Sequence, residues 1–215
     1  MTDKQRKLIF VGGGGHSRSV ADVALSANCK ILGFVDPDKS LDLFGSPRLG
    51  DDADVANIAA NWPDAEFVVT KGQIKSAELR RRLAENLETN GCTIAAPIIS
   101  NDAYISLYVK VGAGSVVMHK TVLNANVVVG RHSIVNTGAI VEHDCVVGDF
   151  THISTRAVVN GGCRIGNGVF LGSGSVVLNG VNICDNVVVG AGSVVVDDIT
   201  EPGTYVGVPA AKTLL

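Results

Sequence analysis

The sequence lacks an excess of charge of either sign, and it lacks an apolar run long enough to cross a membrane. Its 215 residues include 18 basic and 21 acidic side chains, for a formal net charge of −3. No basic run could follow a phosphate backbone, which argues against a nucleic-acid partner. The polar start of the chain leads into a short apolar segment without a hydrophobic signal sequence. We therefore expect a globular cytoplasmic protein that does not bind membranes.

Paired cysteines are also lacking. The five cysteines are scattered, include no Cys-x-x-Cys motif and are odd in number. This usage indicates reduced thiols rather than a disulfide framework.

The region from Ile99 to Thr200 repeats with a period of six residues. Every sixth residue is Ile, Leu or Val, and the residue four places later is small or β-branched. A fixed short period is typical of a solenoid, and hexads indicate a parallel β-helix with three hexads in each triangular coil. Residues one coil apart would stack at about the 4.8 Å spacing of paired strands. The apolar positions are Ile99, Ile105, Val111, Val117, Leu123, Val129, Val135, Val141, Val147, Ile153, Val159, Ile165, Leu171, Val177, Ile183, Val189 and Val195.

An α/β unit precedes the repeats. The apolar run 8–11 leads into four glycines, and a segment with helical spacing follows them. A glycine turn between a strand and a helix aims free N–H groups at a phosphate, and its last members are Gly14, Gly15 and His16. Ser17 stands where the dinucleotide fingerprint has its third glycine, so the motif is incomplete. The alternative is a tight turn with no ligand.

Two further strands are expected to end beside this turn. The apolar run 31–35 ends at Asp36, and the run 66–69 ends shortly before Gly72. Open α/β sheets bind ligands beyond the carboxyl ends of their strands, so Asp36 and Gly72 are candidate ligand contacts. The charged segment 75–90 predicts a helix, and residues 93–99 predict the last strand of this unit.

His143 is a candidate general base. It is third in its hexad, so its side chain points away from the solenoid core, and it lies between Glu142 and Asp144. A neighbouring carboxylate can orient the ring and stabilise the imidazolium that forms when the ring takes a proton. The alternative is a solvated surface histidine.

The histidines do not predict a metal site. Those in the repeat region are separated by 13, 11 and 9 residues, and none of these separations matches the spacing in metal-binding β-helices. They are His119, His132, His143 and His152. We therefore expect no metal.

A strip of small residues is predicted along one corner of the solenoid. Gly172 and Ser173 stack on Gly190 and Ala191 one coil later, which leaves main-chain amides exposed along the helix axis. Such a strip suits a long ligand with amide groups, such as the pantetheine arm of coenzyme A. His152 lies at the edge of this strip, one coil earlier. The alternative is that the glycines serve only the geometry of the corner.

The sequence resembles the sialic-acid O-acetyltransferase-like family of two-domain hexapeptide-repeat sugar acyltransferases. This family includes bacterial N-acetyltransferases of nucleotide-linked 4-amino-4,6-dideoxy sugars. The resemblance implies that the β-helix is left-handed, and that acetyl passes directly from acetyl-CoA to a sugar amine. The segments that carry it are 11–16, 33–36, 141–152 and the terminal Gly207-Val208-Pro209-Ala210.

The resemblance also implies roles for the residues above. His143 would take the proton of the attacking amine, with Asp144 raising its basicity, and His152 would contact the thioester end of acetyl-CoA. The main chain at Ser173 and Ala191, beside Gly172 and Gly190, would hold the pantetheine arm. The nucleotide sugar would contact Gly14, Gly15, His16, Asp36 and Gly72. The family implies a homotrimer with active sites between subunits.

Together these features predict two domains and one reaction. Residues 1–97 would form a Rossmann-like domain that binds the nucleotide sugar, and residues 98–215 would form the β-helical acetyltransferase domain with its tail. We expect N-acetylation of a nucleotide-linked 4-amino-4,6-dideoxyhexose for surface glycans, with UDP favoured over GDP. O-acetylation of sialic acid or a related sugar is the first alternative, and a non-catalytic nucleotide-sugar-binding scaffold is the second.

Overall fold

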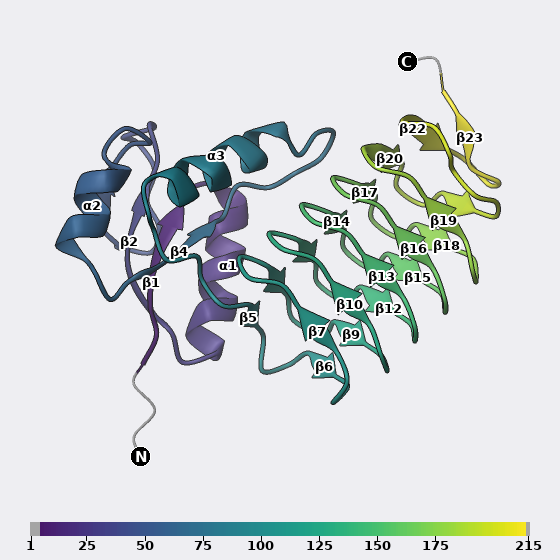
Figure 1. Ribbon diagram of the computed structural model, residues 1–215, viewed down its shortest axis with the longest axis horizontal. Coiled ribbons are helices and arrows are strands. Elements are labelled where there is room, and N and C mark those ends of the chain that lie inside the picture. The colour runs from purple at the N-terminus through teal and green to yellow at the C-terminus, as the bar shows by residue number, and fades with distance from the viewer. Residues whose placement is uncertain (1–4, 214–215) are drawn as a thin grey trace.

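The computed structural model describes residues 5–213, in which an α/β domain is followed by a staircase of short parallel strands (Figure 1). The α/β domain holds a parallel four-stranded sheet with the order β3-β2-β1-β4. No helix in the described part of the chain is long and apolar enough to span a membrane. The elements of this domain are β1 (Lys7–Val11), α1 (Gly15–Ser26), β2 (Lys30–Val35), β3 (Arg48–Gly50), α2 (Val55–Asn61), β4 (Glu66–Val69) and α3 (Glu78–Thr89).

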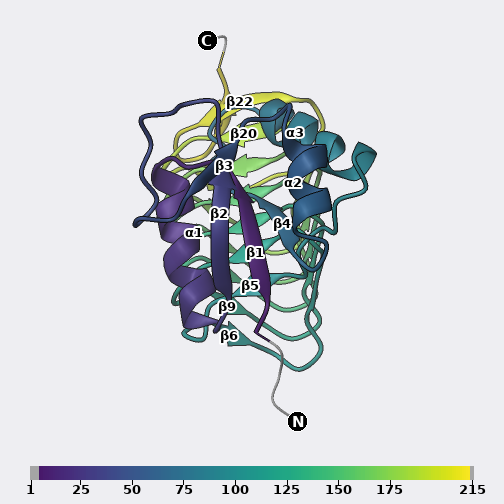
Figure 2. The same cartoon turned by 90° about the vertical axis from the view of Figure 1, so that its left-hand side faces the viewer.

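Alternation along β1 assigns one face of the sheet to each set of helices. Leu8 and Phe10 pack with the buried residues of α1, whereas Ile9 and Val11 pack with α2 and α3. Successive strand residues point to opposite faces, so a continuous apolar run requires cover on both sides. Figure 2 shows α1 on one side of the sheet and α2 and α3 on the other.

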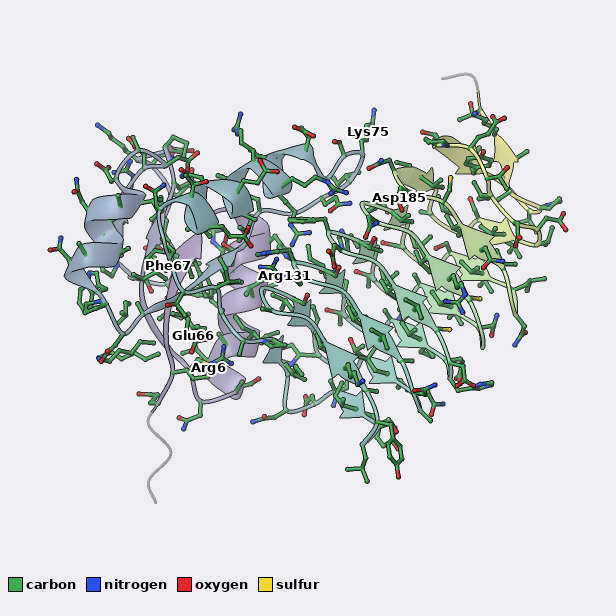
Figure 3. The ribbon with its side chains drawn as sticks, in the orientation of Figure 1. Arg6, Glu66, Phe67, Lys75, Arg131 and Asp185 are labelled. Atoms are coloured by element: carbon green, nitrogen blue, oxygen red, sulfur yellow. The ribbon has the colours of Figure 1, made fainter. Side chains whose placement is uncertain are left out.

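The expected strand at 93–99 is wrong as a single element. Ile94 makes one isolated bridge with Phe67, and Ile98–Ile99 is β5, which belongs to the first coil of the solenoid. At the break, the Arg6 guanidinium donates to the main-chain oxygens of residues 96 and 97 while it pairs with Glu66 at 2.7 Å (Figure 3). The sequence prediction also missed β3 and α2, which are short.

The solenoid has three parallel sheets in which residues 18 apart are paired, as the hexads predict. One sheet holds β7 (Lys110–Val111), β10 (Val128–Val129), β13 (Val146–Val147), β16 (Arg164–Ile165) and β19 (Asn182–Ile183). The second holds β6 (Tyr104–Ile105), β9 (Val122–Leu123), β12 (Ile140–Val141), β15 (Val158–Val159), β18 (Val176–Val177) and β21 (Val194–Val195). The third holds β5, β8 (Val116–Val117), β11 (Ile134–Val135), β14 (His152–Ile153), β17 (Phe170–Leu171), β20 (Val187–Val189), β22 (Gly203–Val206) and β23 (Ala211–Lys212).

The solenoid core consists of the predicted hexad positions. From Val117 to Val195 these side chains form one cluster with the apolar members of the set four places after them. At most positions where the small residue carries a hydroxyl, that group also bonds to the main chain of a neighbouring turn; Ser175 is an exception. Ser133 Oγ, for example, donates to the oxygen of Gly148 at 2.8 Å and accepts from the amide of Thr151. The small residue therefore fits the corner and also satisfies buried backbone groups.

The repeat ends with a shortened coil. Ile183 bridges Ile199, and β20 pairs with β22 at a separation of 16 residues rather than 18. The unbroken run that the sequence predicts as far as Thr200 therefore holds only through Val195. The antiparallel strand β23 then closes this end of the third sheet.

The third sheet of the solenoid is the surface on which the α/β domain packs. Its outward column begins with Ile98, Val116 and Ile134, each at most 1% exposed, continues with His152 at 6%, and then reaches half-buried Phe170. Val116 and Met118 belong to the same apolar cluster as α1. The α/β domain therefore covers the third sheet as far as His152, and the later coils are more exposed on this face.

Candidate functional site

The glycines before α1 fall into two kinds. A Cβ atom at Gly13 would lie 2.5 Å from the ring of Phe34, and Gly12 has a φ of +125°, so both are required by the fold. A Cβ at Gly14 or Gly15 would meet nothing within 4 Å. No side chain caps this helix N-terminus, which leaves its first amides directed outward. The open surface at Gly14 and Gly15 is suited to a phosphate group.

The side chain of Asp36 supports this glycine loop through hydrogen bonds. Its Oδ2 atom accepts from the amide of Gly13 at 2.9 Å and from Lys71 Nζ at 2.5 Å, and its Oδ1 accepts from the amide of Asp38. Burial would raise the pKa of this carboxyl, but the bonds from Lys71, Asp38 and Gly13 outweigh it and hold the pKa below its usual value. The structure gives Asp36 a supporting role in the loop, and it pairs Asp36 with Lys71, which was not predicted from the sequence.

Ser17 accounts for the incomplete glycine motif. Its buried hydroxyl lies 3.0 Å from Thr70 Oγ1 and donates to the main-chain oxygen of Thr70, and Thr70 Oγ1 in turn donates to Gly12. A side chain here ties α1 to the end of β4, where a glycine would only permit close packing.

His16, Gly72 and His152 meet where the two domains join. Gly72 lies against the Cβ of His16, and the rings of His16 and His152 are 6.4 Å apart. His16 Nε2 is buried without a hydrogen-bond partner, and burial, together with nearby Arg80, lowers the pKa of His16 to about 4. A neutral, unpartnered ring nitrogen is thus available between the glycine loop and the solenoid. The predicted sugar and acyl sites are therefore neighbours.

His152 is held as one neutral tautomer. Its Nδ1 lies 2.7 Å from the main-chain oxygen of Gln73, which can only accept, so Nδ1 carries the proton. Its Nε2 lies 3.1 Å from Asn136 Nδ2, which can only donate, because Asn136 Oδ1 accepts from the amide of Thr137. Burial lowers the pKa of His152 to about 3, so the ring stays uncharged at neutral pH. Gln73 and Asn136 were not predicted from the sequence.

The predicted strip is exposed at Ser173 and Ala191. No hydrogen bond within the described part of the chain uses the main-chain N–H of either residue. At the same corner two coils earlier the amide of Thr137 is satisfied by a side chain. The two free amides, one coil apart, can therefore bind carbonyl groups of an extended ligand.

The flanking glycines have a second explanation. A Cβ at Gly172 would lie 2.5 Å from the main-chain nitrogen of Ala191, and one at Gly190 would lie 2.8 Å from the side chain of Val206. Close stacking of the coils therefore requires glycine at both positions whether or not a ligand binds.

His143 lies at another corner of the solenoid and is paired as expected with Asp144. Its Nδ1 is 2.8 Å from Asp144 Oδ2, and both side chains are more than half exposed. Hydrogen bonds from Asn126 and His143 hold the pKa of Asp144 below its usual value, so this carboxylate stays charged. The ring of His143 covers Gly161, where a Cβ would lie 2.6 Å from Nε2. Glycine at 161 thus provides the space for this ring.

The structure does not bring His143 to the other predicted residues within one chain. His143 follows β12 of the second sheet, whereas His152 lies on β14 of the third. No group of three or more His, Cys, Asp or Glu side chains among residues 5–213 could hold a metal ion. His132, which is 1% exposed, instead stacks on Phe150 at 4.9 Å.

Known protein families match both the α/β domain and the solenoid. The family model described as the PglD N-terminal domain matches residues 7–87, and the model of six bacterial transferase hexapeptide repeats matches residues 162–197. A comparison with curated protein sequences finds no significant match.

Solved structures match over nearly the whole chain. GDP-perosamine N-acetyltransferase from Caulobacter crescentus, in complex with CoA and GDP-perosamine, is 31% identical with a TM-score of 0.90, and the match covers 96% of each chain. The acetyltransferase domain of PglB from Neisseria gonorrhoeae is 33% identical with a TM-score of 0.89, over 97% of this chain and 100% of that one. WeeI from Acinetobacter baumannii, at 22% identity, shares the fold. This chain therefore belongs to the two-domain hexapeptide-repeat family of acetyl-CoA-dependent sugar N-acetyltransferases, as its sequence predicts.

Proposed function

We propose that this protein transfers acetyl from acetyl-CoA to the 4-amino group of a nucleotide-linked 4-amino-4,6-dideoxyhexose, in a step of surface glycan synthesis. The observation that carries the proposal is the exposed pair of His143 and Asp144, whose 2.8 Å contact occupies Nδ1 and leaves Nε2 for a substrate. Such a pair suits removal of one proton from an amine.

The proposed reaction needs one base and one leaving group. The amine nitrogen attacks the acetyl carbonyl carbon while His143 Nε2 takes its proton, and Asp144 stabilises the imidazolium. The carbon–sulfur bond then breaks, the sugar amide forms, and the thiolate of CoA leaves and takes up the proton. Atoms and charge balance without a metal or a redox step.

Acetyl-CoA is proposed to bind along the strip of small residues. The free amides of Ser173 and Ala191 would bond to the pantetheine carbonyls, beside Gly172 and Gly190. His152 would lie at the acyl end, where the covered part of the third sheet meets the open part.

The nucleotide sugar is proposed to bind to the α/β domain, residues 1–97. The outward amides at Gly14 and Gly15 support binding of its diphosphate, with Asp36 holding the loop, and His16 and Gly72 would face the sugar. We take UDP as the nucleotide. GDP is the first alternative, because the Caulobacter relative was solved with GDP-perosamine.

The active site is proposed to form between subunits of a homotrimer in the cytoplasm. His143 and the strip lie on different sides of one chain, so one chain alone does not complete the site. A neighbouring copy that presents its His143 to the strip would do so. Residues 98–215 would then supply both the base and the acetyl-CoA surface.

A panel of acceptors tests this proposal. The protein is incubated with acetyl-CoA and UDP- or GDP-linked 4-amino sugars or CMP-sialic acid, with thiol release and product mass as readouts. We expect stoichiometric thiol release and an acetylated product with a 4-amino sugar. Turnover with CMP-sialic acid alone would support O-acetylation instead, and binding without turnover would support a scaffold.

A further inference from the structure

Within residues 5–213, Arg80 is a buried cation without an acidic partner. It lies on the apolar face of α3 with Leu83, Ala84 and Leu87, and it is 1% exposed. Its Nη1 donates to Gln73 Oε1 at 3.2 Å and its Nη2 to the main-chain oxygen of His132 at 2.6 Å, while Nε has no partner. Burial lowers the pKa of Arg80 to about 10, so it remains charged at neutral pH. A buried charge paired only with neutral acceptors is costly to maintain.

Joining the domains does not by itself require this charge. Arg131 pairs with Glu88 at 2.5 Å, Arg81 stacks over Phe150 at 4.9 Å, and His119 lies 2.9 Å from Asp22. These contacts link the α/β domain to the solenoid at partly exposed positions, where charge is cheaper. Arg80 therefore calls for a second explanation.

Gln73 connects Arg80 to the acyl site. It is 2% exposed, and its side chain accepts from Arg80 and donates at 3.4 Å to the main-chain oxygen of Gly168 in the solenoid. Its own main-chain oxygen accepts from His152 Nδ1. The loop that carries it runs from β4 to α3 over the solenoid, with Lys75 near its outer end (Figures 1 and 3). Both the oxygen and the nitrogen of the Gln73 side-chain amide are hydrogen-bonded, and this fixes the direction of its main-chain carbonyl.

We infer that Arg80 is a positioning residue for acetyl transfer, which acts through Gln73 to hold His152, and with it Asn136, in one orientation and one tautomer. The inference rests on the proposed function for the part played by His152. Arg80 touches neither substrate. Its loss would leave the Gln73 side chain held only by its long contacts to the solenoid and let the carbonyl that orients His152 move. Small displacements of groups around a reacting centre can cost about 10²-fold in rate.

Arg80→Met tests the inference, with Arg82→Met as the matched control because Arg82 is an exposed arginine of the same helix. Three quantities are measured: the melting temperature, kcat against KM for acetyl-CoA, and the ¹⁵N shifts of the His152 ring. We expect a folded Arg80→Met protein with kcat lowered at least about tenfold. We also expect a nearly unchanged KM for acetyl-CoA and ¹⁵N shifts that no longer report a single tautomer. Arg80→Lys, which keeps the charge but offers one nitrogen in place of the two that bond Gln73 and His132, is expected to be intermediate.

A folded Arg80→Met protein with the wild-type kcat and the wild-type His152 spectrum would overturn the inference, and so would an equal loss of kcat in Arg82→Met. If Arg80→Met does not fold, Gln73→Leu is measured in the same way, and an unchanged His152 spectrum would be decisive against the inference. The spectra need no substrate. Absence of turnover in the wild type therefore refutes the proposed function separately, while the spectra still decide the role of Arg80.

Discussion

The main-chain oxygen of Gln73 lies 2.7 Å from Nδ1 of His152, across the junction of the two domains. This contact joins the loop between β4 and α3 of the α/β domain to the last covered residue in the outward column of the third sheet. The α/β domain therefore determines that Nδ1, and not Nε2, of this solenoid histidine carries the proton.

Replacement of His143 by alanine is expected to lower kcat by about 10²- to 10⁴-fold, the usual contribution of a general base. KM for acetyl-CoA should change little, because the base acts on the amine of the acceptor and not on the pantetheine arm. Asp144→Asn should cost less, since it keeps one acceptor oxygen for the His143 ring but loses the charge and the acceptor for Asn126. Steady-state thiol release measures kcat and KM for the wild type and for both variants. A folded His143→Ala protein with full activity would refute the assignment of the base.

Gly161→Ala is expected to lower kcat as His143→Ala does, but by a smaller factor. The added methyl group would lie 2.6 Å from His143 Nε2, so the ring must rotate away from its position. Melting temperature should change little, because an exposed ring can move. The control is the same substitution in the His143→Ala background, where it should have no further effect on rate. A further loss there would show that Gly161 acts by another route.

Ser173→Pro is expected to weaken acetyl-CoA binding, with Ser173→Ala as its control. Ser173 precedes Gly174, which has a φ of +68°, in a turn where the amide of Ser175 donates to Gly172. Proline suits the position before such a glycine but has no N–H to offer the ligand. The alanine variant loses only the hydroxyl and should keep wild-type affinity. Equal affinity in both variants, by calorimetry, would remove this amide from the site.

Stability is expected to rise with pH between about 4 and 6.5. Burial lowers the pKa of His16 and of His132 to about 4 and that of His152 to about 3 in the folded protein. The unfolded chain therefore binds more protons than the folded one in this window, and stability is lost as pH falls. Each such histidine contributes up to about 1.4 kcal/mol per pH unit. His132→Asn, which suits the φ of +53° at that position, should reduce the slope by up to one proton in urea unfolding. An unchanged slope would contradict this account.

The sequence predicted the parts of the fold that repeat or alternate. The hexads predicted the coil register through Val195, because one slip would bury a polar residue. The glycine turn and Asp36 were predicted to lie together because parallel strands end at one edge. The shortened last coil was not predicted, since its spacing depends on β22 pairing with β20.

The domain junction was beyond prediction from sequence for a physical reason. Gln73 and His152 are 79 residues apart, and nothing in either local pattern indicates their contact. Arg80 is one of three consecutive arginines on a charged helix, and only the docked solenoid shows which of them is buried. The candidate ligand residues were proposed from motifs, whereas the residues that hold them in place depend on packing between domains.

The most direct test of the central claim compares two acceptors that differ only at C4 of the sugar. Thiol release from acetyl-CoA and the product mass are measured for a nucleotide-linked 4-amino-4,6-dideoxyhexose and for its 4-hydroxy counterpart, with wild-type and His143→Ala protein. The account predicts one acetamide formed for each thiol released, with the amino sugar and the wild-type protein only. Equal release by the His143→Ala protein, or acetylation of the 4-hydroxy sugar alone, would contradict it.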